Sequence, residues 1–124
     1  MKKVISTDKA PAAVGPYSQA IEANGTLYVS GQIPINRATG LTPETIEEQT
    51  RQCLENIKAI VEEAGYSLEN IVKTTVLLDD IGNFTAMNSV YSTYFTSQMP
   101  ARACYQVAKL PLAVMVEIEA IAVK

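Results

Sequence analysis

The strand expected over residues 114–123 restricts the fold most, because it carries apolar side chains on both of its faces. Successive side chains of a strand point to opposite faces, which separates the even from the odd positions. The even positions hold Val114, Val116, Ile118, Ala120 and Ala122, and the odd positions hold Met115, Glu117, Glu119, Ile121 and Val123. Such a strand needs cover on both sides. We expect helices on one side and further copies of the chain, in closed symmetry, on the other.

Five further strands are expected. The first covers Lys3–Ile5, and the next two flank Asn24-Gly25, a pair that favours a hairpin turn. The second strand of this hairpin begins at Thr26 and is expected to end at Ser30, before Gly31. Another strand alternates along residues 70–80, with Val72, Thr74, Val76 and Leu78 on one face, and the fifth covers Arg102 to Val107.

Two helices are expected between these strands. The first has Thr42 as its N-cap, Pro43 at its first helical position and Gly65 as its C-terminal stop. Its apolar residues recur at helical spacing: Ile46, Cys53, Leu54, Ile57, Ile60, Val61 and Ala64. The second helix follows Asn83 and buries Phe84, Met87, Val90, Tyr91, Tyr94 and Phe95.

This order of elements predicts an α+β sandwich. It reads β-β-β-α-β-α-β-β, with both helices on one face of a mixed sheet. The 124 residues, of which 48% are hydrophobic, suffice for one domain with a core, so we expect a single domain over residues 1–124.

The composition disfavours several classes of partner. A net charge of −3, with no basic run beyond Met1-Lys2-Lys3, disfavours binding to nucleic acid. No apolar stretch approaches the roughly 18 residues of a membrane span, and the N-terminus lacks the apolar block of a signal peptide. Cys53 and Cys104 match no metal or redox spacing. We therefore expect a cytoplasmic protein with reduced thiols and no membrane partner.

The chain contains no histidine. Ser-His-Asp triads, Cys-His pairs and histidine-ligated zinc are therefore excluded. Any proton transfer must use a carboxylate, a lysine, a tyrosine, a cysteine, a bound water or the substrate itself.

Arg102 lies in the short apolar run "PARACYQV" at residues 100–107. A guanidinium in such a place needs an anion, because its desolvation costs several kcal/mol. Alternation places Arg102 with Cys104 and Gln106, and Glu117 lies on the next strand along the chain, so Arg102 and Glu117 could face the same space. One interpretation is that Arg102 and Glu117 form a purely structural ion pair. The other is that the planar guanidinium of Arg102 binds a ligand carboxylate.

Five other positions have ordinary structural interpretations beside their possible use in a site. A buried cysteine such as Cys104 is usually a small hydrophobe, and no histidine is present to activate it. Tyr17 would start a strand and Asn88 would be an exposed helix residue. Ser30-Gly31 would end a strand, although Gly31 also allows a ligand to approach the backbone closely.

Four motifs resemble those of the Rid family, in its RidA branch of reactive intermediate deaminases. They are "GPYSQA" (15–20), "SGQIP" (30–34), "PARAC" (100–104) and "VEIEAIA" (116–122), and the similarity covers essentially the whole chain. The resemblance implies a chorismate-mutase-like fold and a homotrimer. In such a trimer the sheets line a central barrel-like core, and three clefts lie between neighbouring subunits.

The resemblance also implies an activity and its residues. The activity is hydrolysis of 2-imino acids, such as 2-iminobutanoate and 2-iminopropanoate, or of their enamine tautomers, to 2-oxo acids and ammonia, without a metal or organic cofactor. The family's carboxylate-binding arginine matches Arg102, and the acidic residue that positions the attacking water matches Glu117. The remaining matched substrate-binding positions are Tyr17, Ser30, Gly31, Asn88 and Cys104.

Two departures from the family pattern concern the rim of the cleft. The segment "YFTSQM" before Pro100 looks shorter than in many members, and Leu112 stands where many carry a charged residue. Alternative functions remain open at this point: a sensor that binds 2-oxo acids without turnover, a ribonuclease or translation inhibitor, and a chaperone-like role for which no motif is identified.

Overall fold

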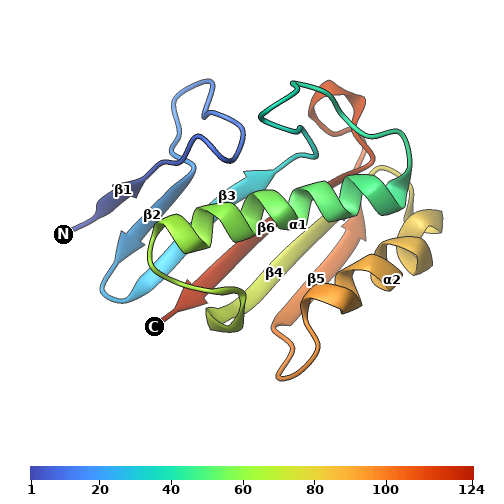
Figure 1. The fold of residues 1–124 in the computed structure, drawn as a ribbon. Coiled ribbons are helices and arrows are strands. Elements are labelled where there is room, and N and C mark those ends of the chain that lie inside the picture. The colour runs from blue at the N-terminus through green and yellow to red at the C-terminus, as the bar shows by residue number, and fades with distance from the viewer.

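A computed structural model describes residues 1–124 as one six-stranded sheet with two helices on one of its faces (Figure 1). The strands are β1 (Lys3–Ile5), β2 (Ala20–Ala23), β3 (Thr26–Gln32), β4 (Ile71–Leu78), β5 (Ala101–Gln106) and β6 (Val116–Val123). The helices are α1 (Ile46–Glu63) and α2 (Phe84–Tyr94). The predicted α+β architecture and element order are confirmed.

Strand β6 lies inside the sheet, although it is last in the chain. The strand order is β1-β2-β3-β6-β4-β5, and every neighbouring pair is antiparallel except β4 and β5. The sheet is therefore mixed, as predicted. Because β6 joins the hairpin half of the sheet to the β4–β5 half, its two faces decide what each side of the molecule buries.

The even positions of β6 form the core with the helices. Val116, Ile118 and Ala122 are fully buried, together with Leu54 and Ile57 of α1. Burial of apolar side chains at about 25 cal/mol per Å² supplies the main stabilisation of such a layer. Val72 does not share the buried face of Thr74, Val76 and Leu78, contrary to the prediction. The pairing with β6 shifts between Ile71 and Lys73, and this irregularity leaves Val72 47% exposed.

Helix α1 begins three residues later than predicted. Its N-cap is Thr45 rather than Thr42: Thr45 has an extended backbone, and its Oγ1 accepts a hydrogen bond from Glu48 N at 3.1 Å. Gln49 Nε2 donates a hydrogen bond to the Pro43 carbonyl. This bond joins the segment around Pro43 to the side of the helix, so that the segment does not form a further helical turn. Gly65, at φ +82°, follows the C-terminal end as predicted.

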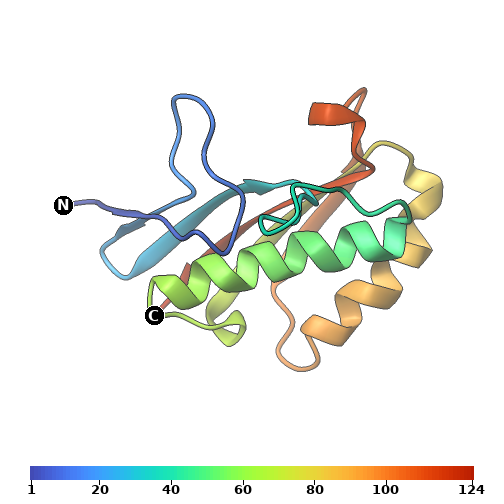
Figure 2. The same cartoon turned by 45° about the horizontal axis from the view of Figure 1, so that its top comes forward.

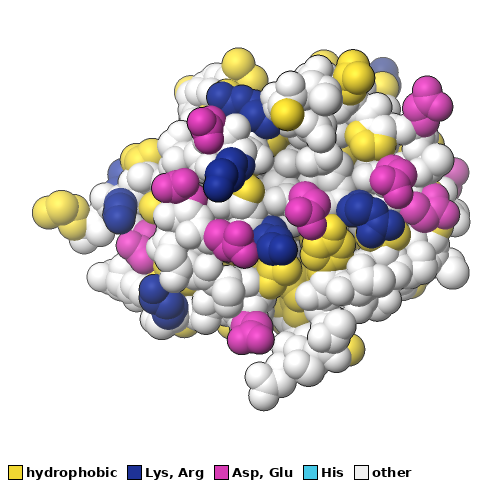
Figure 3. Space-filling view, in the orientation of Figure 1, with side chains coloured by type: hydrophobic (Ala, Val, Ile, Leu, Met, Phe, Trp, Pro, Cys, Tyr) yellow, Lys and Arg dark blue, Asp and Glu magenta, His cyan; other side chains and the backbone are white.

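The other face of the sheet is open. Figure 2 shows both helices on one side of the sheet, whereas the outer part of the loop before β2 and the turn before β6 stand away from them. Large side chains on this open face are exposed, including Tyr28 at 50% and Tyr105 at 51%. On the helix side, by contrast, acidic and basic side chains alternate over α1 (Figure 3).

Neither helix is long and apolar enough to cross a membrane.

Candidate functional site

Arg102 lies on edge strand β5 and points to the helix side of the sheet. Its guanidinium carbon lies 4.7 Å from the centre of the Tyr91 ring and 5.5 Å from that of Phe84, both on α2. Its NH1 donates a hydrogen bond of 2.7 Å to Asn88 Oδ1, one turn along the same helix. Cation–π contacts and one neutral acceptor thus orient the guanidinium without neutralising its charge.

No carboxylate pairs with Arg102. The only ion pair in the chain joins Arg51 and Glu48 on the surface of α1. Arg102 instead lines a depression of about 330 Å³, together with Asn88, Tyr91, Ser92, Phe95, Met99 and Pro100. A guanidinium that is oriented, partly buried and without a counter-ion is suited to bind an external carboxylate.

Glu117 lies on β6 and faces the open side of the sheet. It lines a groove of about 720 Å³, formed also by Val14, Tyr17, Ser30, Gly31, Ile33, Pro111, Leu112 and Glu119. Burial raises the pKa of the Glu117 carboxyl above its ordinary value, and the nearby Glu119 carboxylate raises it further. A carboxyl with a raised pKa in a groove is the kind of group that can take up and release a proton during a reaction.

Arg102 and Glu117 lie on opposite faces of the sheet, so the expectation that they share one space within a chain is wrong. Arg102 pairs with Thr74, and Thr74 pairs with Ala120, which places all three on the helix side. Glu117 pairs with Leu77, at an odd position of β4, and therefore points the other way. The structural Arg102–Glu117 ion pair is wrong for the same reason.

Three more of the predicted residues line the groove beside Glu117. Gly31 lies against its carboxylate, and a Cβ at position 31 would overlap Glu117 Oε2. Tyr17 lies on the loop before β2, with its side chain 50% exposed. Ser30 also lines the groove, but its hydroxyl is used internally: Oγ donates a hydrogen bond of 2.6 Å to the Ser18 carbonyl. Tyr17, Gly31 and Glu117 thus form one half of the candidate site.

Cys104 and Asn88 belong to the Arg102 half. Cys104 is two residues along β5 and shares the helix side, since it pairs with the buried Val76. Burial raises the pKa of its thiol, and the nearby Arg102 only partly opposes this. The thiol is therefore protonated at neutral pH, which argues against a thiolate nucleophile. Asn88, whose ordinary reading was an exposed helix residue, is instead the hydrogen-bond partner of Arg102.

Sequence reasoning missed the part that Phe84 and Tyr91 take in this site. Both were assigned only to the apolar stripe of the second helix. Their spacing with Asn88 was the available signal, because residues at i, i+4 and i+7 lie on one face of a helix. Tyr91 also forms a buried hydrogen bond of 2.7 Å between its hydroxyl and Thr74 Oγ1, which fixes its ring under the guanidinium.

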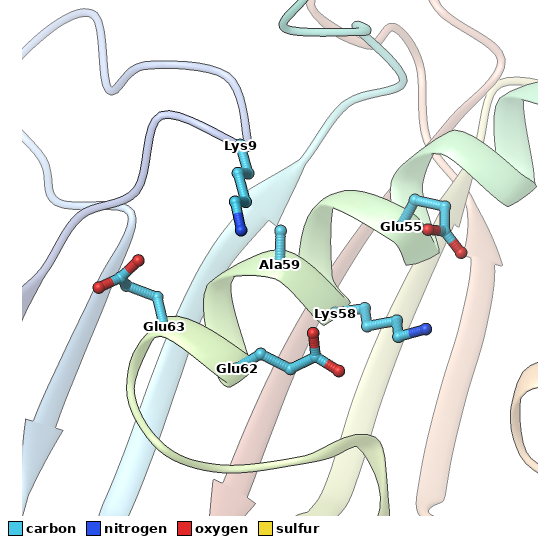
Figure 4. Close-up of a pocket in the computed structure, with 6 residues that line it drawn as sticks. All are labelled: Lys9, Glu55, Lys58, Ala59, Glu62 and Glu63. Atoms are coloured by element: carbon cyan, nitrogen blue, oxygen red, sulfur yellow. The ribbon is translucent and has the colours of Figure 1, made fainter.

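A third depression lies away from both halves. It has a volume of about 310 Å³ on the solvent side of α1 and is lined by Lys9, Glu55, Lys58, Ala59, Glu62 and Glu63 (Figure 4). Its charged side chains are of mixed sign and all lie on the surface, where ion pairs contribute little. None of the predicted site residues lines it, so it is not a candidate for the chemistry.

The fold has close counterparts among known proteins. The family described as Endoribonuclease L-PSP matches residues 7–124 of this chain. A crystal structure of YyfA, a Rid family protein from Yersinia pestis, has a TM-score of 0.97 and 50% identity, and each chain covers 100% of the other. The chain belongs to the Rid family. A mouse relative named 2-iminobutanoate/2-iminopropanoate deaminase is 51% identical over 125 residues, covering 100% of this chain and 93% of the mouse protein.

One Rid-like structure was solved with an amino acid. Escherichia coli TdcF with bound serine has a TM-score of 0.96 and 45% identity, covering 98% of each chain.

Proposed function

We propose that this protein hydrolyses reactive 2-imino acids, or their enamine tautomers, to 2-oxo acids and ammonia in the cytoplasm. Compounds of the size of 2-iminobutanoate and 2-iminopropanoate are the proposed substrates. The observation that carries the proposal is the state of Arg102: it is fixed by Asn88 and Tyr91, it lines a depression, and it has no carboxylate partner.

The relatives support this choice of substrate. Mouse, rat and bovine proteins named 2-iminobutanoate/2-iminopropanoate deaminase are 51–53% identical to this chain. The serine bound to TdcF carries the carboxylate and the α-nitrogen that a 2-imino acid also carries. A site that recognises both groups needs a fixed cation and a proton donor or acceptor. Arg102 and Glu117 supply these two functions in the proposal.

The proposed chemistry needs orientation more than a strong base. Arg102 binds the substrate carboxylate and thereby fixes the neighbouring imine carbon, which is already electrophilic. A water held by Glu117 adds to that carbon and gives its proton to the Glu117 carboxylate. Glu117 returns the proton to the nitrogen, which gives a carbinolamine. Glu117 then transfers the hydroxyl proton to the amino group as the C–N bond breaks, so that ammonia leaves and the hydroxyl oxygen becomes the 2-oxo group. Such acid–base assistance typically contributes about 10²–10⁴-fold, and it involves no metal or organic cofactor.

The proposal requires two copies of the chain at each site. Arg102 and Glu117 point to opposite sides of one sheet, so a single chain cannot place both on one small substrate. The open face of the sheet, which carries Glu117 and exposed apolar side chains, is the surface that a second copy would cover. We propose a homotrimer in which Arg102 of one subunit and Glu117 of a neighbour form each of three clefts.

A coupled assay tests this function. A pyridoxal-phosphate-dependent threonine dehydratase generates the imine, and formation of 2-oxobutanoate and ammonia is followed with and without this protein. The unchanged protein should accelerate both, whereas Arg102→Ala and Glu117→Gln should not. Arg51→Ala, at the surface arginine paired with Glu48, is the matched control and should stay active. Binding of 2-oxobutanoate without faster ammonia release would contradict turnover and favour the sensor.

Ribonuclease activity is the weaker candidate, although the family description contains the word endoribonuclease. The net charge of −3 and the absence of histidine do not suit phosphate binding or the usual acid–base cleavage of RNA. If the unchanged protein cleaved RNA and the Glu117→Gln variant did not, ribonuclease activity would become the stronger candidate.

A further inference from the structure

We propose that Gln19 is a positioning residue that holds Tyr17 over the Glu117 groove. The inference rests on the proposed function, since it concerns how the groove receives its substrate. Gln19 itself is 3% exposed and does not line the groove. Its side chain instead fastens the loop on which Tyr17 lies.

Tyr17 has little of its own to hold it in place. It lies between β1 and β2, and its side chain is 50% exposed. Its backbone N–H donates a hydrogen bond of 2.9 Å to the Gly15 carbonyl, which closes a tight turn within the loop. A half-exposed ring on a loop keeps one position only if the backbone at both ends of that loop is fixed.

The Gln19 amide fixes the beginning of the loop to its end. Its Oε1 accepts a hydrogen bond of 2.7 Å from Thr7 N, and its Nε2 donates to the Thr7 carbonyl at 3.0 Å. The same Nε2 lies 2.8 Å from the Pro11 carbonyl and 3.3 Å from the Ala10 carbonyl. One buried side chain therefore joins residue 19 to residues 7–11 across the loop.

A second fastening comes from β3. Ser30 N donates a hydrogen bond of 2.9 Å to the Gln19 carbonyl, and Ser30 Oγ donates to the Ser18 carbonyl. The backbone beside Tyr17 is thus held to β3, while the Gln19 side chain holds the beginning of the loop, residues 7–11. Together they fix the turn that carries Tyr17 above Gly31 and Glu117.

The place that Gln19 occupies suits a side-chain amide. The pocket around Gln19 offers one backbone N–H and three carbonyls, so it needs an acceptor and a donor on one planar group. Methionine has a similar length but donates no hydrogen bond and is at best a weak acceptor. Carbonyls that lose a donor in the interior must find water, and the loop would open to admit it.

The test is a double-mutant cycle on imine hydrolysis with Gln19→Met, Tyr17→Ala and the combined variant. Gln19→Met should lower kcat/KM by about 10- to 100-fold, as expected for a misplaced substrate contact. It should add no further loss in the Tyr17→Ala background, because it acts through Tyr17. The pH profile that reports Glu117 should stay unchanged, since Gln19 makes no contact with that carboxyl.

Thr50→Val is the matched control. Thr50 is fully buried and donates a hydrogen bond to the Ile46 carbonyl inside α1, remote from the loop. The Thr50→Val variant should be less stable than the unchanged protein but have the same kcat/KM. The role of Gln19 would be overturned if the losses of kcat/KM from Gln19→Met and Tyr17→Ala were additive in the combined variant. It would also be overturned if Thr50→Val lowered kcat/KM as much as Gln19→Met does.

Amide hydrogen exchange separates this inference from the proposed function. In Gln19→Met, residues 12–18 should exchange faster while β6 keeps its protection, whatever reaction the protein catalyses. Unchanged exchange at residues 12–18 would overturn the inference even if the protein is a deaminase. If the unchanged protein does not hydrolyse imines but residues 12–18 still exchange faster in Gln19→Met, the proposed function is wrong. The role of Gln19 in holding the loop would still stand.

Discussion

Gly31 and Glu117 are in such close contact that a Cβ at position 31 would take the place of the Glu117 carboxylate oxygen Oε2. The two residues lie on neighbouring strands, β3 and β6, where the pairing shifts between Val29 and Gln32. Position 31 is therefore restricted by the space that the proposed catalytic carboxylate occupies.

Gly31→Ala should abolish imine hydrolysis while the protein remains folded, because the new methyl group displaces the Glu117 carboxylate. The coupled assay measures the loss, and circular dichroism measures the fold. Gly40→Ala is the control: a Cβ there meets no atom within 4 Å, and its positive φ costs about 1 kcal/mol without touching the groove. Full activity in Gly31→Ala would show that the Glu117 position is unimportant.

Glu119→Gln should move the pH dependence of kcat/KM to lower pH. The raised pKa of Glu117 keeps its carboxyl protonated to higher pH, and the proposed role needs the carboxylate. Activity should therefore rise with pH through the pKa of Glu117. Removing the Glu119 charge lowers that pKa, and added salt should shrink the difference between the two proteins. Profiles recorded at low ionic strength from about pH 4 to pH 8 that coincide for both proteins would refute this assignment.

Asn88→Asp should weaken substrate binding by giving Arg102 a permanent counter-ion. The Asn88 oxygen already lies 2.7 Å from Arg102 NH1, so a carboxylate at this position would pair with the guanidinium and compete with the substrate. We expect KM to rise at least about tenfold, equivalent to 1.4 kcal/mol. Ser89→Asp adds the same charge at the next, exposed residue of α2 and should leave KM unchanged. Equal KM values for Asn88→Asp and the unchanged protein would contradict the carboxylate-binding role.

Tyr91→Phe should reduce stability and leave activity nearly intact. The variant keeps the ring beside Arg102 but removes the hydrogen bond to the buried Thr74 hydroxyl. The free energy of unfolding, from urea denaturation, should fall by about 1–2 kcal/mol. Tyr91→Leu removes the ring as well, and should therefore lose both stability and affinity for the substrate. A Tyr91→Phe protein with unchanged stability would show that the hydroxyl pair contributes nothing.

Local chemistry made much of the fold predictable. Alternating apolar residues marked the strands, Asn24-Gly25 marked the hairpin, and Gly65 marked the end of α1. The start of α1 was misjudged because Thr42 and Thr45 are both good N-caps, and Thr42 is the one that a proline follows. The choice between them depends on what Gln49 contacts, which sequence spacing does not reveal.

The site was less predictable, because its geometry depends on strand order. The sequence places Arg102 and Glu117 on consecutive strands, yet β4 lies between β5 and β6 in the sheet. Whether two residues share a face then depends on the register of both pairings through β4, and that register put Arg102 and Glu117 on opposite sides. Individual site residues can be recognised from local motifs, but their arrangement requires the sheet.

The most direct test of the shared site mixes two inactive variants. Arg102→Ala and Glu117→Gln subunits, co-refolded in equal amounts, should form oligomers in which about a quarter of the interfaces combine an intact Arg102 with an intact Glu117. Activity should return to about a quarter of that of the unchanged protein, and Arg102→Ala mixed with the double variant should stay inactive. Mixed oligomers that form but regain no activity would contradict a cleft built from the opposite sheet faces of two subunits.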